Sequence, residues 1–241
     1  MDFWGTLLVD PPSSDDRYKR RRMDDFEKIL AAAGLGLSRR ALDAGYESSG
    51  GYLGRTWRDH RDVSVEHHVS AILTAADKNL SRRLPRDVMT ELVEAYSRPA
   101  LLVPPDADPG ARLALETLAA RGYTLAVVSN TMRTPGVVLR KLLDGYGLLS
   151  FFAHTTFSDE VGVRKPAPDI FAHALRAVGG EAAAAVHVGD DLTLDVRGAR
   201  AAGMRAIHVA GASGRSSAKS IADAVIPSLL ELPAAVARLD G

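Results

Sequence analysis

The amino-acid sequence predicts an α/β protein whose core is a doubly wound parallel sheet, with a helical segment inserted near its beginning. Short, continuous apolar runs at residues 123–128, 183–188 and 206–209 alternate with segments of helical period. This alternation is typical of parallel strands joined by crossover helices. The runs are uninterrupted, as expected when helices cover both faces of a sheet. Residues 13–100, by contrast, show helical spacing and no strand-like alternation.

The inserted segment is expected to contain four helices. In each, apolar residues recur three and four positions apart and would form one buried face. We expect these helices over residues 24–33, 38–45, 64–73 and 85–96. Gly34 ends the first helix and the stretch Ser48–Gly51 ends the second, because glycine favours helix termination. Ser64 is a suitable N-cap for the third.

The region after residue 100 supplies the strands and their crossover helices. Asp108 is expected to cap a helix that has Pro109 at its first position and ends at Gly122. The apolar strands that follow end at Ser129 and at Gly189. Further helices are expected over residues 135–143, 168–178 and 195–202, further strands at 152–157 and 225–226, and a surface loop at 211–217.

Composition excludes several classes of protein. The chain has 241 residues, and Lys+Arg and Asp+Glu number 30 each, so no global field favours nucleic acid or an anionic membrane. It has no cysteine, which excludes disulfides and a thiolate nucleophile. No apolar run reaches the roughly 18 residues of a membrane span. We expect a soluble cytoplasmic protein that acts on a small molecule; the sequence carries no signal for an oligomeric state.

Polar side chains stand where the predicted strands end. Asp2 lies at the very start of the chain, Ser129 follows a buried strand, and Lys165 precedes a proline-rich loop. Asp190 ends another strand, and Asp195 falls in the first turn of the next helix. Ligands of doubly wound sheets bind at the carboxyl ends of the strands, so we expect these side chains to meet in one site.

The loop after Asp2 contains Gly5 and Thr6. Gly5 permits a tight bend with positive φ. Such a bend can direct successive backbone N–H groups at an anion. Thr6 is therefore expected to contact the substrate.

Four stretches resemble, in order and spacing, the motifs of the haloacid dehalogenase-like (HAD) hydrolase superfamily. They are Asp2–Leu7, Val127–Asn130, Arg164–Pro168 and Val188–Asp195. The resemblance spans nearly the whole chain. It implies a HAD-like Rossmannoid core formed by residues 1–12 and 101–241, and a helical C1 cap formed by residues 13–100.

The resemblance also implies catalytic roles. Asp2 would be a nucleophile that forms a covalent aspartyl intermediate, which water then cleaves. The Ser129 hydroxyl and the Asn130 N–H would bind a substrate oxygen. Lys165 would neutralise charge on Asp2 and on the transferred group.

A magnesium site is the cofactor implied by the resemblance. Its ligands would be the carboxylates of Asp2, Asp190 and Asp195 and the backbone carbonyl of Trp4, with Asp191 as an outer group. Oxygen ligands of this kind, together with water molecules, suit Mg²⁺.

Trp4 departs from the pattern of the family's phosphatases, which carry a second Asp at this position as general acid and base. An indole donates a hydrogen bond but transfers no proton near neutrality. General acid–base help is worth about 10²–10⁴-fold in rate. The family's 2-haloacid dehalogenases have an aromatic Tyr at this position. Halide leaves unprotonated, so their reaction tolerates the loss of a general acid. We also expect Trp4 to contact the substrate.

Three hypotheses follow, in order of preference. The Gly-Asp-Asp sequence at Gly189–Asp191 and the distal Asp195 are the metal-binding form of the fourth motif, which favours a Mg²⁺-dependent phosphohydrolase. The alternative is a 2-haloacid dehalogenase-like hydrolase, favoured by Trp4. The third is a ligand-binding protein on a hydrolase scaffold that lacks catalysis.

Three further expectations concern the start of the chain, a basic run and a pair of histidines. Only Met1 precedes Asp2, whereas a strand usually needs about five residues. We expect the native start to lie upstream; the alternative is that a shortened strand suffices. The basic run Arg17–Arg22 is expected to be a solvated helix face. His67 and His68 are neighbours and cannot share a helix face, which argues against a paired metal site.

Overall fold

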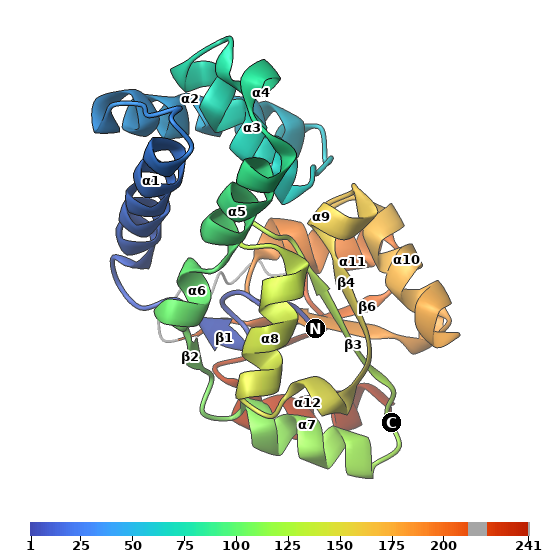
Figure 1. The fold of residues 1–241 in the computed structure, drawn as a ribbon. Coiled ribbons are helices and arrows are strands. Elements are labelled where there is room, and N and C mark those ends of the chain that lie inside the picture. Colours follow the sequence, from blue (N-terminus) through green and yellow to red (C-terminus); the bar gives the residue numbers. More distant parts are fainter. Residues whose placement is uncertain (212–220, 241) are drawn as a thin grey trace.

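The computed structural model describes residues 1–211 and 221–240 (Figure 1). The loop expected at residues 211–217 lies, apart from its first residue, outside this part of the chain. The strands are β1 Leu8–Val9, β2 Asp106–Ala107, β3 Leu125–Ser129, β4 Phe152–Phe157, β5 Val186–Gly189, β6 Arg205–Val209 and β7 Ala224–Ile226. β3 pairs with β4 and β6 pairs with both β5 and β7, always in parallel, whereas β1 and β2 form a small antiparallel pair.

The first two residues join the two parallel halves into one sheet. The Asp2 N–H donates to the Val188 carbonyl of β5 at 2.8 Å. On the other side, the Val128 N–H of β3 donates to the Met1 carbonyl at 2.9 Å, and the Met1 amine donates to the Ala126 carbonyl at 2.7 Å. The order of neighbouring backbones is therefore β4, β3, residues 1–2, β5, β6, β7, and residues 1–2 join the two halves of the sheet.

Helices cover both faces of this sheet, and two adjacent residues of β3 show it. Val127 packs in an apolar cluster with α7 (Ala111–Ala120), α8 (Gly136–Gly145) and α12 (Leu232–Asp240). Val128 faces the opposite way and packs with α10 (Pro168–Val178) and α11 (Gly198–Ala201). The predicted doubly wound α/β fold is confirmed, and α12 is a helix that the sequence analysis did not identify.

Five helices lie together to one side of the sheet, and we call them the helical unit (Figure 1). They are α1 Ser14–Ala32, α2 Arg39–Arg58, α3 Val65–Ala76, α4 Leu80–Arg83 and α5 Arg86–Ser97. The unit has an apolar cluster of its own, in which Phe26, Ile72 and Tyr96 are fully buried. α6 (Pro99–Leu102) leads back to the sheet, and its Ala100 already packs in the core cluster.

The remaining elements are short. They are α9 Ser158–Val161, the π-helix Leu192–Arg197 and three 3₁₀ turns at Leu149–Phe151, Ala182–Ala184 and Leu229–Glu231. No helix of the described residues is both long enough and apolar enough to cross a membrane.

Helix α2 differs from its prediction because it continues through the glycine-rich stretch Ser48–Gly51. Tertiary packing explains the difference. A Cβ at Gly45 would lie 2.5 Å from the Ile72 carbonyl, so glycine lets α2 pack closely against α3. Gly45 thus permits close packing, and the glycines of Ser48–Gly51 do not end the helix.

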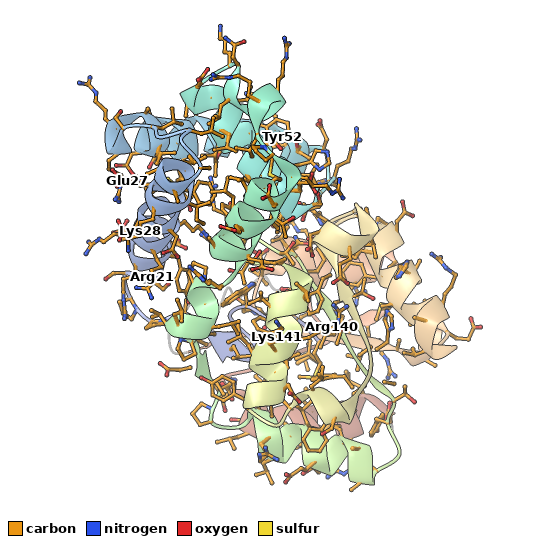
Figure 2. All side chains as sticks on the ribbon, viewed as in Figure 1. Arg21, Glu27, Lys28, Tyr52, Arg140 and Lys141 are labelled. Carbon is orange, nitrogen blue, oxygen red and sulfur yellow. The ribbon has the colours of Figure 1, made fainter. Side chains whose placement is uncertain are left out.

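The basic run Arg17–Arg22 lies within α1, which starts ten residues earlier than expected. Arg21, like Glu27 and Lys28, lies on the outer side of this helix, in agreement with a solvated face (Figure 2). Among the basic residues of the run, Arg22 is the exception, because its side chain is only 2% exposed. The expectation of a uniformly solvated run was therefore wrong at this residue.

A cavity of about 370 Å³ lies behind Met1, between β3 and β5. Its walls include Leu125 of β3, Val186 of β5 and Phe171 of α10. Burial and the nearby Lys165 ammonium lower the pKa of the Met1 amine to about 5. The backbone of residues 1–2 therefore pairs with β3 and β5 at one end of these strands, and the cavity occupies the space between the strands behind the Met1 amine.

An extension of four apolar, β-branched residues before Met1 is expected to raise the thermal stability of the protein. The added residues can pair with both strand edges and bury apolar surface, and the buried amine becomes a peptide group. Each kcal/mol gained should raise Tm by about 2–4 °C. Calorimetry would measure it, with a Gly-Ser extension of equal length as the control. Equal Tm values for the two extensions would contradict the prediction.

His68 is a buried histidine of the helical unit. It is 2% exposed, its Nδ1 lies 3.2 Å from the Tyr96 hydroxyl, and its Nε2 has no partner among the described residues. Burial, together with the charges of Arg133 and Arg22, lowers the pKa of His68 to about 3. The imidazole is therefore neutral in the folded protein, although it would take up a proton near pH 6.5 in the unfolded chain.

The free energy of unfolding is expected to fall between pH 6.5 and pH 4 partly because of His68. In this range the unfolded state binds a proton that the folded state excludes, so stability decreases as pH falls, by up to about 1.4 kcal/mol per pH unit. Urea denaturation of His68→Gln should show a shallower slope. His67→Gln, at an exposed position of the same helix, is the control. Equal slopes for both variants would count against this account.

Candidate active site

The loop that carries Asp2 is a tight turn closed by its own backbone. Leu8 N–H donates to the Phe3 carbonyl at 2.9 Å, and Gly5 N–H donates to the Leu8 carbonyl at 2.8 Å. Gly5 has φ +73°, and a Cβ there would lie 2.4 Å from the Asp190 carboxylate, so only glycine fits. The Gly5 N–H is used within the turn, so the anion nest expected from the sequence lacks this donor.

Lys165 connects Asp2 with Asp195. Its Nζ lies 2.7 Å from Asp2 Oδ1 and 2.6 Å from Asp195 Oδ1, and all three side chains are buried. His187 Nε2 lies 2.8 Å from the same Asp195 oxygen, and the Asp191 N–H donates to Asp195 Oδ2 at 3.0 Å. Both oxygens of Asp195 thus accept hydrogen bonds from the chain, which favours a role in holding Lys165 over direct ligation of a metal ion.

The charges of this group are unevenly distributed. Burial alone would raise the pKa of Asp195, but the Lys165 ammonium and the His187 N–H hold it well below its usual range. Burial raises the pKa of Asp2, against the opposing effect of Lys165. Burial also lowers the pKa of His187 to about 4, so its ring is neutral at pH 7. Asp195 therefore carries the charge that balances Lys165, and Asp2 gains from any further cation nearby.

Asn130 fixes the segment that carries Lys165. Its Nδ2 donates to the Lys165 carbonyl at 3.0 Å, and its Oδ1 accepts from the Lys165 N–H at 2.8 Å. This pair of hydrogen bonds ties the end of β3 to the loop before α10. The Asn130 side chain is thus engaged in positioning the lysine, whereas the substrate contact expected from the sequence involves its backbone N–H.

Ser129 and Thr6 present hydroxyl groups to the site. Ser129 Oγ is buried and has no hydrogen-bond partner of regular geometry among the described residues, although it is close enough to lower the pKa of Asp2. A buried donor without a partner is costly unless a ligand supplies one. Thr6 Oγ1 lies 3.4 Å from Asp190 Oδ1 and therefore faces that carboxylate.

Three carboxylates converge on one point. One oxygen from each of Asp2, Asp190 and Asp195 lies within 4.8 Å of the others. Partial burial and the charges of Asp2 and Asp195 raise the pKa of Asp190 to about 7. Among the described residues, Lys165 is the single cation that contacts this group. The excess of negative charge and the oxygen donors fit a divalent cation such as Mg²⁺.

Trp4 lies between these three carboxylates and a second cavity, which is larger than the one behind Met1 and is called the larger cavity below. Its ring packs edge-on against Phe3, with ring centroids 4.9 Å apart, and its buried Nε1 has no partner among the described residues. No described residue donates a hydrogen bond to its carbonyl oxygen. The carbonyl is therefore free to bind the metal expected from the sequence, and the residue also lines the cavity.

The larger cavity has a volume of about 520 Å³ and lies where the helical unit meets the sheet. Its walls come from the Asp2 loop at Trp4 and Gly5, from α1 and α2, and from the loop after β3. It is the space through which a ligand would reach the loop of Asp2. The sequence analysis did not single out Arg133, which lines it, because no motif contains this residue.

A second buried group ties the helical unit to the sheet, and the sequence analysis missed it. The Asp62 carboxylate accepts hydrogen bonds from Arg164, Ser158 and the Trp57 indole. The Arg164 guanidinium also lies over the Trp57 ring, with its Cζ 4.4 Å from the ring centroid. A short antiparallel bridge between Arg61 and Val163 adjoins it. Asp62 is far from every motif in the sequence, and only the fold reveals its partners.

Comparison with known proteins finds relatives for most of this chain. A family profile described as haloacid dehalogenase-like hydrolase matches residues 1–203. The mouse haloacid dehalogenase-like hydrolase domain-containing protein 3 is 40% identical over 128 residues, which are 51% of this chain and 49% of that protein. A phosphoserine phosphatase of Thermus thermophilus is 40% identical over 119 residues, 49% of this chain and 46% of the enzyme. The chain spans about half the length of the curated relatives it matches.

Solved structures show the same architecture over the whole chain. The 2-haloacid dehalogenase of Pseudomonas syringae pv. Tomato DC3000 is 25% identical, with a TM-score of 0.68, and the match covers 99% of this chain and 96% of that one. Relatives of this chain thus include proteins named for phosphatase chemistry and for dehalogenase chemistry.

Replacing Asp62 by Asn is expected to lower the free energy of unfolding by about 3–5 kcal/mol, because the buried guanidinium of Arg164 loses its counter-charge. Urea denaturation would measure the change. Asp59→Asn, at an exposed position of the same loop, is the control and should change stability by less than about 0.5 kcal/mol. A loss for Asp62→Asn no larger than that of the control would contradict the role of this ion pair.

Proposed function

The chain belongs to the haloacid dehalogenase-like hydrolases, and from this membership we propose that it is a Mg²⁺-dependent phosphohydrolase. It would act on a small phosphorylated metabolite through an aspartyl-phosphate intermediate. The observation that carries the proposal is the group of three converging carboxylates, of which only Asp2 and Asp195 contact an ammonium of the described residues, that of Lys165. A dehalogenase has no use for such an excess of negative charge, because it would repel both the nucleophile and an anionic carboxylate substrate.

In the proposed reaction, a carboxylate oxygen of Asp2 attacks the phosphorus of the substrate. A bond forms between this oxygen and phosphorus, and the bond between phosphorus and the leaving oxygen breaks with its electron pair going to that oxygen. Lys165 balances charge on Asp2, and the free Ser129 hydroxyl donates to a phosphoryl oxygen. Water then attacks the aspartyl phosphate, which releases inorganic phosphate and restores Asp2.

Asp2, Asp190 and the Trp4 carbonyl are the groups that would hold Mg²⁺. The bound ion would supply positive charge to the carboxylates and to the phosphoryl oxygens. Asp195, expected from the sequence as a further ligand, is better suited to orient Lys165, since both of its oxygens accept hydrogen bonds within the chain.

We further propose that residues 1–12 and 101–241 form the catalytic core and that residues 13–100 form a C1 cap. The cavity between the helical unit and the Asp2 loop supports this division, because a lid over that space limits access of water to the reacting phosphate. Its walls come from α1 and α2 on one side and from the loop after β3 on the other.

Trp4 restricts the substrates of such an enzyme. Its indole supplies no proton to the departing oxygen, so substrates with a good leaving group should react faster, and water must protonate an alkoxide. The same residue favours the second candidate, a 2-haloacid dehalogenase-like reaction in which a carbon–halogen bond breaks and halide departs unprotonated. The structural likeness to a 2-haloacid dehalogenase also supports this second candidate.

Purified protein is expected to hydrolyse acetyl phosphate and p-nitrophenyl phosphate with Mg²⁺ and to lose this activity with chelator. Asp2→Asn should lower kcat/KM by about 10³-fold or more, because it removes the nucleophile. Asp87→Asn, at an exposed position of α5, is the control. Phosphate release and chloride release from 2-chloropropionate would be measured side by side.

The outcomes separate the candidates. Chloride release in the presence of chelator, without phosphate hydrolysis, would replace the phosphohydrolase by the dehalogenase. If neither activity is found, and if the affinity for these compounds is unchanged by Asp2→Asn, a binding protein without a catalytic role would be favoured.

A further inference from the structure

Two arginines in the wall of the larger cavity have no acidic partner. Arg22 comes from α1 and Arg133 from the loop after β3, and both line this cavity together with Trp4 and Gly5. Among the described residues, no carboxylate lies within ion-pair distance of either guanidinium, whereas the neighbouring Lys19 is paired with Glu47. Placing charges without a counter-ion out of water is costly, and an anionic ligand in this cavity would offset that cost.

All three guanidinium nitrogens of Arg22 donate hydrogen bonds to other residues of the protein. Its Nε donates to the Tyr96 carbonyl at 2.8 Å, its Nη1 to the Tyr46 hydroxyl at 3.3 Å and its Nη2 to the Arg133 carbonyl at 2.8 Å. It also lies over the Tyr96 ring, 4.4 Å from the centroid. Arg22 therefore fixes the backbone of Arg133 and adds positive charge to the wall.

Arg133 keeps one edge of its guanidinium free. Its Nη1 donates to the Tyr96 hydroxyl at 3.1 Å and to Ser49 Oγ at 3.2 Å, and the group lies 4.1 Å from the centroid of the Tyr46 ring. No described residue accepts a hydrogen bond from its Nε or Nη2. These two nitrogens form the edge that binds a carboxylate with two parallel hydrogen bonds.

The charge of the cavity changes from its inner wall to its mouth. The inner wall is positive, and the same arginines help to lower the pKa of the nearby His68. Asp15 and Asp16, both exposed in the first turn of α1, and the half-buried Asp10 line the outer part. An anionic group of a ligand is therefore favoured at the inner wall, beside Arg133.

We propose that Arg133 binds a carboxylate of the substrate, so that the substrate is a small phosphorylated organic acid. The phosphate would lie at Asp2, and the cavity that runs from Trp4 and Gly5 to Arg133 would hold the rest of the molecule. This inference rests on the proposed phosphohydrolase function. Arg133 would then be the residue that determines specificity, and Arg22 the residue that positions it.

The test compares two substrates that differ only at the group in question. 3-Phosphoglycerate carries a carboxylate where glycerol 3-phosphate carries a hydroxymethyl group. With Mg²⁺, the unmodified protein is expected to prefer 3-phosphoglycerate in kcat/KM by about 10- to 100-fold, the value of a charged hydrogen-bonded pair. Arg133→Gln should bring this ratio close to one, and Arg133→Lys should keep part of it.

Arg20→Gln is the matched control, because it removes the same charge from an exposed position of α1 and should keep the full preference. Binding of 3-phosphoglycerate to Asp2→Asn would be measured by calorimetry with and without the Arg133→Gln change, which gives a readout independent of turnover. Affinity should fall by a similar factor of about 10 to 100.

The two proposals can fail separately. Hydrolysis of acetyl phosphate without any preference for the carboxylate, or with a preference that survives Arg133→Gln, would overturn the carboxylate site and leave the phosphohydrolase. If no phosphate ester is hydrolysed, the calorimetric experiment decides: binding that depends on Arg133 supports the site, and binding that does not depend on it overturns the site.

Discussion

The ion pairs of Lys165 are the constraint on which the rest of the site depends. One buried ammonium contacts Asp2 and Asp195, which come from the start of the chain and from the turn after β5. A buried ammonium needs its counter-charges, and a buried carboxylate needs the ammonium, so none of the three can move without a large cost. His187 and Asn130 serve this arrangement, the first by a hydrogen bond to Asp195 and the second by holding the lysine backbone.

The parallel sheet brings these residues together. Residues 1–2 pair with β3 on one side and β5 on the other, so the carboxyl ends of three neighbouring backbones meet at one edge. Asp2, Ser129 and Asp190 all leave the sheet there, and the glycine at position 5 lets the Asp190 carboxylate approach the turn. The helical unit adds what the sheet lacks, which is an aromatic and cationic wall facing the same space.

The sequence allowed the sheet, the crossover helices and the convergence of the polar motifs to be predicted, because periodicity and strand ends are local properties. It did not reveal Asp62, Arg22 or Arg133. Each owes its importance to partners more than 30 residues away, as Asp62 does to Arg164, and a single charged residue in a helix or loop carries no local signal of burial. The prediction that α2 ends at Ser48–Gly51 was wrong for a related reason, because packing of α2 against α3 is not visible in the local sequence.

Arg164 and Lys165 are consecutive, and the first is bound to Asp62 of the helical unit's α2–α3 loop while the second is bound to Asp2. Separation of Asp62 from Arg164 would therefore pull on the peptide unit that carries the ammonium. Movement of the helical unit relative to the sheet and a change in the charge balance around Asp2 are thereby mechanically coupled through two adjacent side chains.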